Sequence, residues 1–135
     1  MNHEDRYISN GRKMITWEGL NNSSAQLFPK GSVIISSRAP IGYIMIAEQD
    51  AATSQGCKTF SAYNQDLVLS EFVYYLMYFR TPDLILRASG TTFKEISGKG
   101  IGETVIPLPP LAEQHRIVAR LNELLPLCDT LEEAR

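Results

Sequence analysis

The 135-residue chain lacks most of the features that mark secreted, membrane-spanning or disulfide-bonded proteins. Its only cysteines, Cys57 and Cys128, lie far apart in the sequence, which favours reduced thiols in the cytoplasm over a disulfide framework. It has no run of about 18 apolar residues that could span a membrane, and its polar beginning, MNHEDR, does not have the pattern of a signal peptide. We therefore expect a soluble cytoplasmic protein with no membrane partner.

The chain also lacks the residue patterns of common enzyme and metal sites. It has no Gly-x-Ser-x-Gly nucleophile elbow, no glycine-rich cofactor loop after a strand and no Asn-Pro-Pro-aromatic motif of adenine methyltransferases. The two histidines, His3 and His115, belong to no set with metal-ligand spacing, and Cys57 pairs with His115 in composition only. We predict a protein that is not an enzyme and needs no metal or cofactor of its own.

The chain also lacks a large excess of charge of either sign. The net charge is −2, which argues against a protein that coats nucleic acid through a general basic field. Residues 111–135 carry three arginines and five acidic residues, so this segment accounts for the −2 and the rest of the chain is close to neutral. Any surface for nucleic acid must therefore be a small patch within residues 1–110.

Turn-forming residues recur along the first part of the chain. Their spacing predicts an α+β domain over residues 1–109, with a small mixed, largely antiparallel sheet and packed helices. Runs of β-branched and apolar residues between the turns predict strands over residues 13–17, 32–36, 41–47, 57–60, 91–96 and 103–106. Residues 1–12 are expected to be a polar lead, and residues 19–24 and 97–100 are expected to be loops.

Two helices are expected after residue 69. The first begins at Ser70, which can cap it, and one face carries Phe72, Tyr75, Leu76 and Phe79. Thr81 can cap a second helix, with Pro82 in its first turn and Gly90 as its stop. Helical spacing favours packing of the aromatic residues 72–79 on the sheet over base stacking, and Trp17 is also expected to be packed.

Residues 110–135 predict a separate, long coiled-coil helix. Pro110 suits a first helical position, and the apolar residues that follow recur at intervals of four, three, four and three. The members of this stripe are Ile117, Leu121, Leu124, Cys128 and Leu131. Such a stripe is typical of a helix that pairs with another helix, whereas Pro126 within it predicts a kink or an early stop.

Four blocks in the same order resemble the specificity (S) subunit of type I restriction-modification systems. They are FPKGSVIISSRAPIG (28–42), ATSQGCK (52–58), SGTTFKEIS (89–97) and IPLPPLAEQHRIV (106–118). The resemblance extends over residues 14–133. Each S subunit of this family has two target recognition domains, each of which reads half of a bipartite DNA site. Two long antiparallel helices separate these domains and hold the modification subunits.

The resemblance implies a partial recognition domain for double-stranded DNA, followed by one of the two helices. Methylation with S-adenosylmethionine would belong to the modification (methyltransferase) subunit, and ATP-dependent cleavage would belong to the restriction subunit. With only one helix present, a homodimer through residues 110–135 is expected to restore the helix pair. The alternative is an assembly or dimerisation fragment that has lost useful affinity for DNA.

The candidate DNA contacts lie in loops of these blocks. Arg38, beside Ser37, could contact a guanine edge or a phosphate, or it could be a solvated cation that orders its turn. Gln55 suits an adenine edge, Gly56 allows close approach of the backbone and Lys58 can neutralise a phosphate; the alternative is a β-bulge with ordinary surface side chains.

A third candidate segment surrounds the glycines of residues 90–100. Thr91, Thr92, Lys94 and Lys99 could position phosphates, although structural roles fit these residues at least as well. If the segment is a strand, alternation places Phe93 on the face opposite to Thr92 and Lys94, so these side chains cannot all touch DNA.

Overall fold

A computed structural model describes residues 6–38 and 40–134. Its sheet has four short strands: β1 (Tyr7–Ile8), β2 (Val33–Ser36), β3 (Ile44–Ala47) and β4 (Cys57–Phe60). Their spatial order is β1-β3-β2-β4. β1 runs parallel to β3, and the other two pairs are antiparallel. The predicted mixed, largely antiparallel sheet is therefore confirmed.

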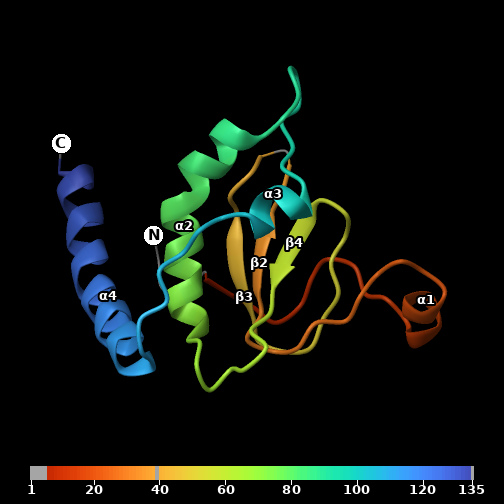
Figure 1. Ribbon diagram of the computed structural model, residues 1–135, viewed down its shortest axis with the longest axis horizontal. Coiled ribbons are helices and arrows are strands. Elements are labelled where there is room, and N and C mark those ends of the chain that lie inside the picture. Colours follow the sequence, from red (N-terminus) through yellow and green to blue (C-terminus); the bar gives the residue numbers. More distant parts are fainter. Residues whose placement is uncertain (1–5, 39, 135) are drawn as a thin grey trace.

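Two long helices stack on one side of this sheet (Figure 1). α2 (Ser70–Arg87) lies against β3 and β2, and α4 (Leu111–Glu133) packs on the far side of α2. Two short helices, α1 (Trp17–Asn21) and α3 (Gly98–Gly102), lie outside this stack. Figure 1 shows α1 on the side of the molecule opposite to α4. No helix in the described part of the chain is long and apolar enough to cross a membrane.

The core lies between the sheet and α2, because β2 and β3 alternate. Val33 and Ile35 on β2 are buried, and so are Ile44 and Ile46 on β3, whereas the intervening Ile34 and Met45 are only half-buried. From α2, the buried residues are Phe72, Val73, Tyr74, Tyr75, Met77 and Leu84. This packing explains why the apolar runs predict β2, β4 and the start of α2 correctly.

α2 is one continuous helix, where the sequence predicts two. Thr81 does not cap a new helix, because its hydroxyl donates to the Met77 carbonyl at 2.9 Å within α2. Gly42, in the turn between β2 and β3, has φ +107°, and a Cβ there would lie 2.3 Å from the Thr81 methyl carbon. This turn supports the helix just before Pro82, so tertiary packing outweighs the hydrogen bond that the proline removes.

The expected strand over residues 13–17 is wrong. α1 begins at Trp17, because the Thr16 hydroxyl accepts a hydrogen bond from the Gly19 N–H at 3.0 Å and caps the helix. Trp17 is 72% exposed, so the prediction that it is packed is also wrong. The expected polar lead instead contains β1, whereas its residues 1–5, including His3, lie outside the described part.

The strands expected over residues 91–96 and 103–106 are also absent from the structure. Of these residues, only Glu95 forms bridges, with Arg38 and Ser89. The expected loop over residues 97–100 is instead the start of α3, because the Ser97 hydroxyl caps it by accepting from the Gly100 N–H at 3.0 Å. A local cap thus makes a short helix of a segment whose glycines predict a loop.

The aromatic residues of α2 divide between the two faces of the helix. Tyr74 and Tyr75 are buried, as predicted, whereas Phe79 is 76% exposed and Tyr78 is half exposed, so the predicted apolar face does not hold along the whole helix. The buried Arg6 guanidinium lies 5.3 and 5.1 Å from the ring centroids of Tyr74 and Tyr75. Arg6 also donates to Asn122 of α4 at 3.2 Å, so it connects the beginning of β1 to both long helices.

A second contact connects β1 to α2. The Tyr7 hydroxyl donates to the Glu71 carboxylate at 2.6 Å. Burial, followed by this hydrogen bond, raises the pKa of Tyr7 to about 12. The neutral phenol is therefore the form that the fold stabilises.

α4 is anchored to the body at its first turn. Gln114 is fully buried; its amide nitrogen donates to the carbonyls of Leu67 and Pro109, each at 2.9 Å. Its side-chain oxygen accepts from the Leu69 N–H at 2.8 Å, next to the start of α2. Val118 is buried one turn later. These contacts fix the direction in which α4 leaves the domain.

The predicted apolar stripe of α4 divides into two parts. Ile117 and Leu121 pack against the body of this chain, so they are not free for another helix. Leu124, Cys128 and Leu131 are exposed. The helix continues through Pro126 to Glu133, so the early stop that the proline allows does not occur.

Candidate nucleic-acid interface

Three of the predicted segments converge around Ser37. The Ser37 N–H donates to the Gly56 carbonyl at 2.8 Å, and the Ser37 carbonyl accepts from the Ile96 N–H at 3.0 Å. The backbone of residues 37–38 therefore lies between residues 55–58 and residues 95–99. Blocks that are far apart in the sequence thus meet at one place.

Ser37 itself is a correction to the predicted set. It has no exposed surface, and its hydroxyl has no hydrogen-bond partner among the described residues. A side chain in this position cannot reach a duplex. Its part in this surface is structural, because its backbone places Arg38.

Arg38 is exposed and lies across Gly56. A Cβ at Gly56 would lie 3.2 Å from the Arg38 Nε, so glycine leaves room for the guanidinium side chain. The sequence predicts that Gly56 lets DNA approach the backbone; in the structure it is Arg38 that makes this approach. The bridge between Arg38 and Glu95 holds the backbone of the arginine in place.

Two lysines come from the segments on either side of this arginine. The half-buried Lys58 donates from Nζ to the Gln55 carbonyl at 2.9 Å, and its stem passes beside Gly98. Lys99, the next residue on α3, is exposed, with its Nζ 3.9 Å from the Glu103 carboxylate. We call Arg38, Lys58 and Lys99 the basic cluster. A cluster of three cations is small, as expected from the near-neutral charge of residues 1–110.

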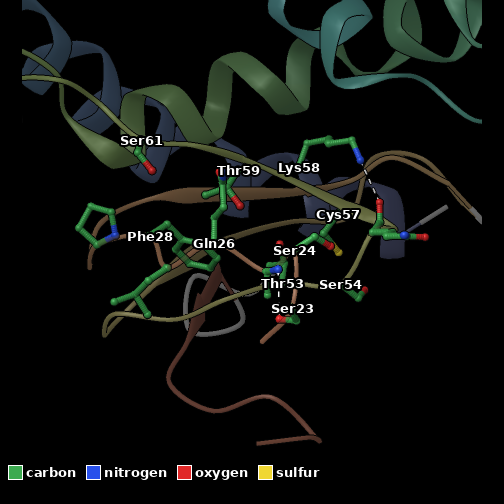
Figure 2. Close-up of a pocket in the computed structure, with 14 residues that line it drawn as sticks. Ser23, Ser24, Gln26, Phe28, Thr53, Ser54, Cys57, Lys58, Thr59 and Ser61 are labelled. Atoms are coloured by element: carbon green, nitrogen blue, oxygen red, sulfur yellow. Dashed lines mark hydrogen bonds between the residues drawn. The ribbon is translucent and has the colours of Figure 1, made fainter. Parts of the chain in front are cut away.

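A polar groove of about 650 Å³ has Lys58 of the basic cluster in its lining (Figure 2). Its walls are residues 23–29 on one side and residues 53–61 on the other, and Gln55 and Lys58 line it. On β4, Lys58 and Phe60 pair with Ile35 and Val33, whose side chains face α2. Thr59 lies between them, so its side chain points to the opposite face of the sheet. The groove that Thr59 lines therefore lies on the face away from α2. The remaining polar lining includes Ser23, Ser24, Gln26, Thr53, Ser54 and Thr59.

The groove is lined with groups that suit a nucleic acid. Serine and threonine hydroxyls donate to phosphate oxygens, and glutamine amides can bind base edges. Sequence reasoning did not include Gln26, Thr53 and Ser54 among the candidate contacts, although Thr53 and Ser54 lie in the family block 52–58. Dense Ser, Thr and Gln in two turn-rich segments is the signal that could have identified them.

The other predicted residues lie at the tip of a separate loop. Thr91, Thr92 and Lys94 are exposed between α2 and α3, where the chain rises above the rest of the molecule (Figure 1). The bridge between Glu95 and Arg38 places this loop next to the basic cluster. Among the residues described, no group of three or more His, Cys, Asp or Glu side chains could hold a metal ion.

The comparisons with known proteins agree on one family. The family model described as "Type I restriction modification DNA specificity domain" matches residues 2–135. The type I restriction enzyme MjaIX specificity subunit of Methanocaldococcus jannaschii is 38% identical over 123 residues, which are 90% of this chain and 28% of the relative. The EcoDI specificity subunit of Escherichia coli is 42% identical over 45 residues, which are 33% of this chain and 10% of the relative.

Solved structures agree with these sequence relatives. The HsdS subunit from Thermoanaerobacter tengcongensis has a TM-score of 0.64 and 29% identity, over 80% of this chain and 25% of that one. A chain from a structure of a type I R-M system, solved to explain complex assembly and conformational transition, has a TM-score of 0.62 and 34% identity, over 81% of this chain and 26% of that one. The chain spans about a quarter of the length of these structures. It belongs to the family of type I restriction-modification DNA specificity domains.

Proposed function

We propose that this chain is a DNA-reading part of a type I restriction-modification specificity subunit and that it reads one half-site. The observation that carries the proposal is that backbone contacts bring the segments of Arg38, Lys58 and Lys99 together around Ser37, with the polar groove at the edge of the same strand β4. Cations and hydroxyls can position phosphates there, while Arg38 and Gln55 can bind base edges. Methylation with S-adenosylmethionine and ATP-dependent cleavage then belong to the modification and restriction subunits.

The charge distribution supports a duplex on the body of the protein and not on α4. Residues 111–135 carry a net charge of −2, whereas Arg38, Lys58 and Lys99 belong to the body, whose charge is close to neutral. Each phosphate that a cation neutralises contributes about −0.9 to the slope of log affinity against log salt concentration. Three such contacts give a slope of about −3, which is modest for a DNA-binding protein.

Titration with duplex DNA at low and moderate salt tests the proposal. Because the target site is unknown, the probe is a pool of short duplexes with randomised centres, from which bound molecules are selected and sequenced. The Arg38→Gln variant should weaken binding by about fivefold or more, since a good arginine contact contributes about 1–3 kcal/mol. Arg120→Gln is the matched control, because it removes the same charge from α4, where Arg120 pairs with Glu123 at 2.7 Å.

The outcomes separate the two hypotheses. Salt-sensitive binding, an enriched sequence and a selective effect of Arg38→Gln support DNA reading. No binding by the wild type at low salt contradicts it and favours the assembly or dimerisation fragment. Equal losses from Arg38→Gln and Arg120→Gln would show a general charge effect and would contradict this interface.

We further propose that the exposed half of α4 pairs with a second copy of the chain, and that this helix also docks the modification subunit. Leu124, Cys128 and Leu131 continue the stripe at spacings of four and three, and all are exposed. Full burial of a leucine contributes about 1.5–3 kcal/mol. With Ile117 and Leu121 already packed on the body, the remaining stripe supports a weaker dimer than five free residues would.

Sedimentation equilibrium at tens of micromolar protein tests this pairing. The double variant Leu124→Asp/Leu131→Asp should shift the mass to that of a monomer, because both carboxylates would be buried without partners. Met14→Asp is the control: Met14 is 82% exposed and belongs to the segment before α1, far from α4 (Figure 1). A wild type that is monomeric throughout, or association unchanged in the double variant, contradicts the proposal.

The same proposal places the protein in the cytoplasm, where the DNA of a restriction-modification system is encountered. Both cysteines are free in the structure; Cys57 is half-buried and Cys128 is exposed on α4. Free thiols of this kind persist in a reducing compartment.

A further inference from the structure

The exposed loop between α2 and α3 is held in one backbone conformation. Ser89 and Glu95 exchange two hydrogen bonds, from the Ser89 N–H at 3.0 Å and from the Glu95 N–H at 2.9 Å. Gly90 has φ +110°, and a Cβ there would lie 2.3 Å from the Phe93 carbonyl oxygen. Only glycine fits this position, so the loop closes tightly over residues 90–94.

The base of this loop is anchored in the domain. Ile96 is 2% exposed, and its N–H donates to the Ser37 carbonyl at 3.0 Å. Glu95 forms its bridge with Arg38, the central residue of the basic cluster. The tip of the loop therefore has a fixed place next to the surface that we propose for DNA.

At this tip, Phe93 is 78% exposed. Its sequence neighbours Thr91, Thr92 and Lys94 are exposed too, so the ring lies among hydroxyls and an ammonium group. The molecule thus holds one aromatic side chain in water, in a defined position and among polar neighbours.

This combination of groups fits a duplex better than a protein surface. An apolar side chain can insert at a base step or stack on a base, and hydroxyls and ammonium groups bind the phosphates on either side. A docking site for a protein usually presents a wider apolar patch at its centre. Here the other residues at the tip are polar.

We infer that Phe93 contacts a base of the bound DNA by stacking or wedging, while Thr91, Thr92 and Lys94 hold the adjacent phosphates. The inference rests on the proposed function, and it adds a base contact by Phe93 to the phosphate contacts that the sequence predicts for its neighbours. Because residues 91–94 form a tight loop and no strand, Phe93 and its polar neighbours can face the same ligand. Phe93 would then influence which base step the domain prefers.

Affinity measurements with the randomised duplex pool test the contact. The Phe93→Ala variant should bind about tenfold more weakly, because loss of one aromatic stack on a base typically has an effect of this size. Its salt slope should stay that of the wild type, whereas Lys94→Gln should reduce the slope by about one phosphate contact. Phe93→Tyr should retain most of the affinity. Thermal unfolding should be the same for all variants, since these side chains are exposed.

A fluorescence experiment reads the stacking directly. The chain has one tryptophan, Trp17, so the double variant Trp17→Phe/Phe93→Trp carries its only indole at the loop tip. Duplex DNA should quench this indole and shield it from acrylamide. Heparin, a polyanion without bases, should do neither.

The outcomes also distinguish the inference from the proposed function. If the wild type does not bind the duplex pool, the proposed function fails and the inference fails with it. If the wild type binds but Phe93→Ala binds equally well, or if heparin and DNA have the same effect on the indole, only the inference is overturned. Unchanged DNA binding by Phe93→Ala together with lost co-purification of a modification subunit would show that the loop contacts protein instead.

Discussion

Gln114 offers the sharpest test of how the long helix is attached. Its fully buried amide connects three backbone groups from two other segments: the carbonyls of Leu67 and Pro109 and the N–H of Leu69. The Gln114→Leu substitution keeps a similar volume but removes all three hydrogen bonds. It tests whether α4 is locked to the start of α2 by this one side chain.

The expected loss of stability follows from the three groups that are left behind. A buried backbone group without a partner costs about 1–3 kcal/mol. These groups lie in a half-buried region, where water can partly replace the lost partner, so the lower part of that range applies to each. We therefore expect Gln114→Leu to reduce the free energy of unfolding by about 3–5 kcal/mol, a large part of the 5–15 kcal/mol typical of a domain.

The Gln114→Glu variant tests the same contacts through the direction in which pH changes stability. It still offers an oxygen to the Leu69 N–H but turns a second carboxylate oxygen towards the two carbonyls. Repulsion and burial then raise the pKa of the new carboxyl group in the folded state. Stability is therefore lost as the pH rises through this folded pKa, and the variant should recover part of it as the pH falls from about 7 to about 5.

Urea unfolding followed by circular dichroism measures both effects. Gln26→Leu is the matched control, because Gln26 is exposed and should change stability by less than about 0.5 kcal/mol. A loss below about 1 kcal/mol in Gln114→Leu would refute the lock, since one unpaired buried group alone costs that much. A Gln114→Glu variant whose deficit does not change with pH would refute the proposed position of its carboxylate.

Other predictions concern single contacts. Gly90→Ala should lower the unfolding free energy by about 1–3 kcal/mol, because φ +110° and the Phe93 carbonyl exclude a side chain; an unchanged melting temperature would contradict this. Arg6→Met should cost about 1–3 kcal/mol in urea unfolding, since it removes the charge that contacts two tyrosine rings, and a neutral effect would contradict that contact. Tyr7 has a raised folded pKa of about 12, so its contribution to stability is complete below about pH 10 and is lost towards pH 12. The Tyr7→Phe variant should therefore lose less stability over this range than the wild type, and parallel curves would contradict it.

The sheet was predictable where burial alone decides the structure. β2 and β4 lie within one residue of the expected ranges, because short runs with β-branched and apolar residues between turn signals predict strands. The start of α2 at Ser70 follows from helical spacing in the same way. Neither β1 nor its parallel pairing with β3 could be read from two residues in a polar segment.

The errors occur where distant contacts or local caps decide. Pro82 breaks an isolated helix, but the turn at Gly42 packs against Thr81 and α2 continues. Residues 91–96 have good strand formers, yet the backbone at Gly90 closes them into a loop. In each case the structure depends on atoms of another segment or on a backbone conformation that only glycine adopts. Secondary-structure propensity contains no information on either.

The candidate site was predictable in part for a similar reason. Loop chemistry and the family blocks identify Arg38, Gln55 and Lys58, and the structure brings these residues together around Gly56. The groove wall formed by residues 23–29 was missed: its Ser and Gln content is visible in the sequence, but only the fold brings it opposite β4. The alternation argument, by which Phe93 could not touch DNA together with Thr92 and Lys94, failed with the strand on which it depended.

The anchoring of α4 gives these separate features one consequence for function. Gln114 fixes the first turn of α4, and Arg6 connects Asn122 in its middle to Tyr75 on α2, so the helix is held at two points along its inner side. A partner that binds the exposed half of α4 is then held at a set distance and angle from the DNA-reading loops. On the proposed function, weakening this attachment changes how two recognition surfaces are spaced and leaves the bases that each surface prefers unchanged. Substitutions of Gln114 should therefore change the stability and the spacing of the two sites, whereas substitutions of Arg38 and Phe93 should change the preferred bases.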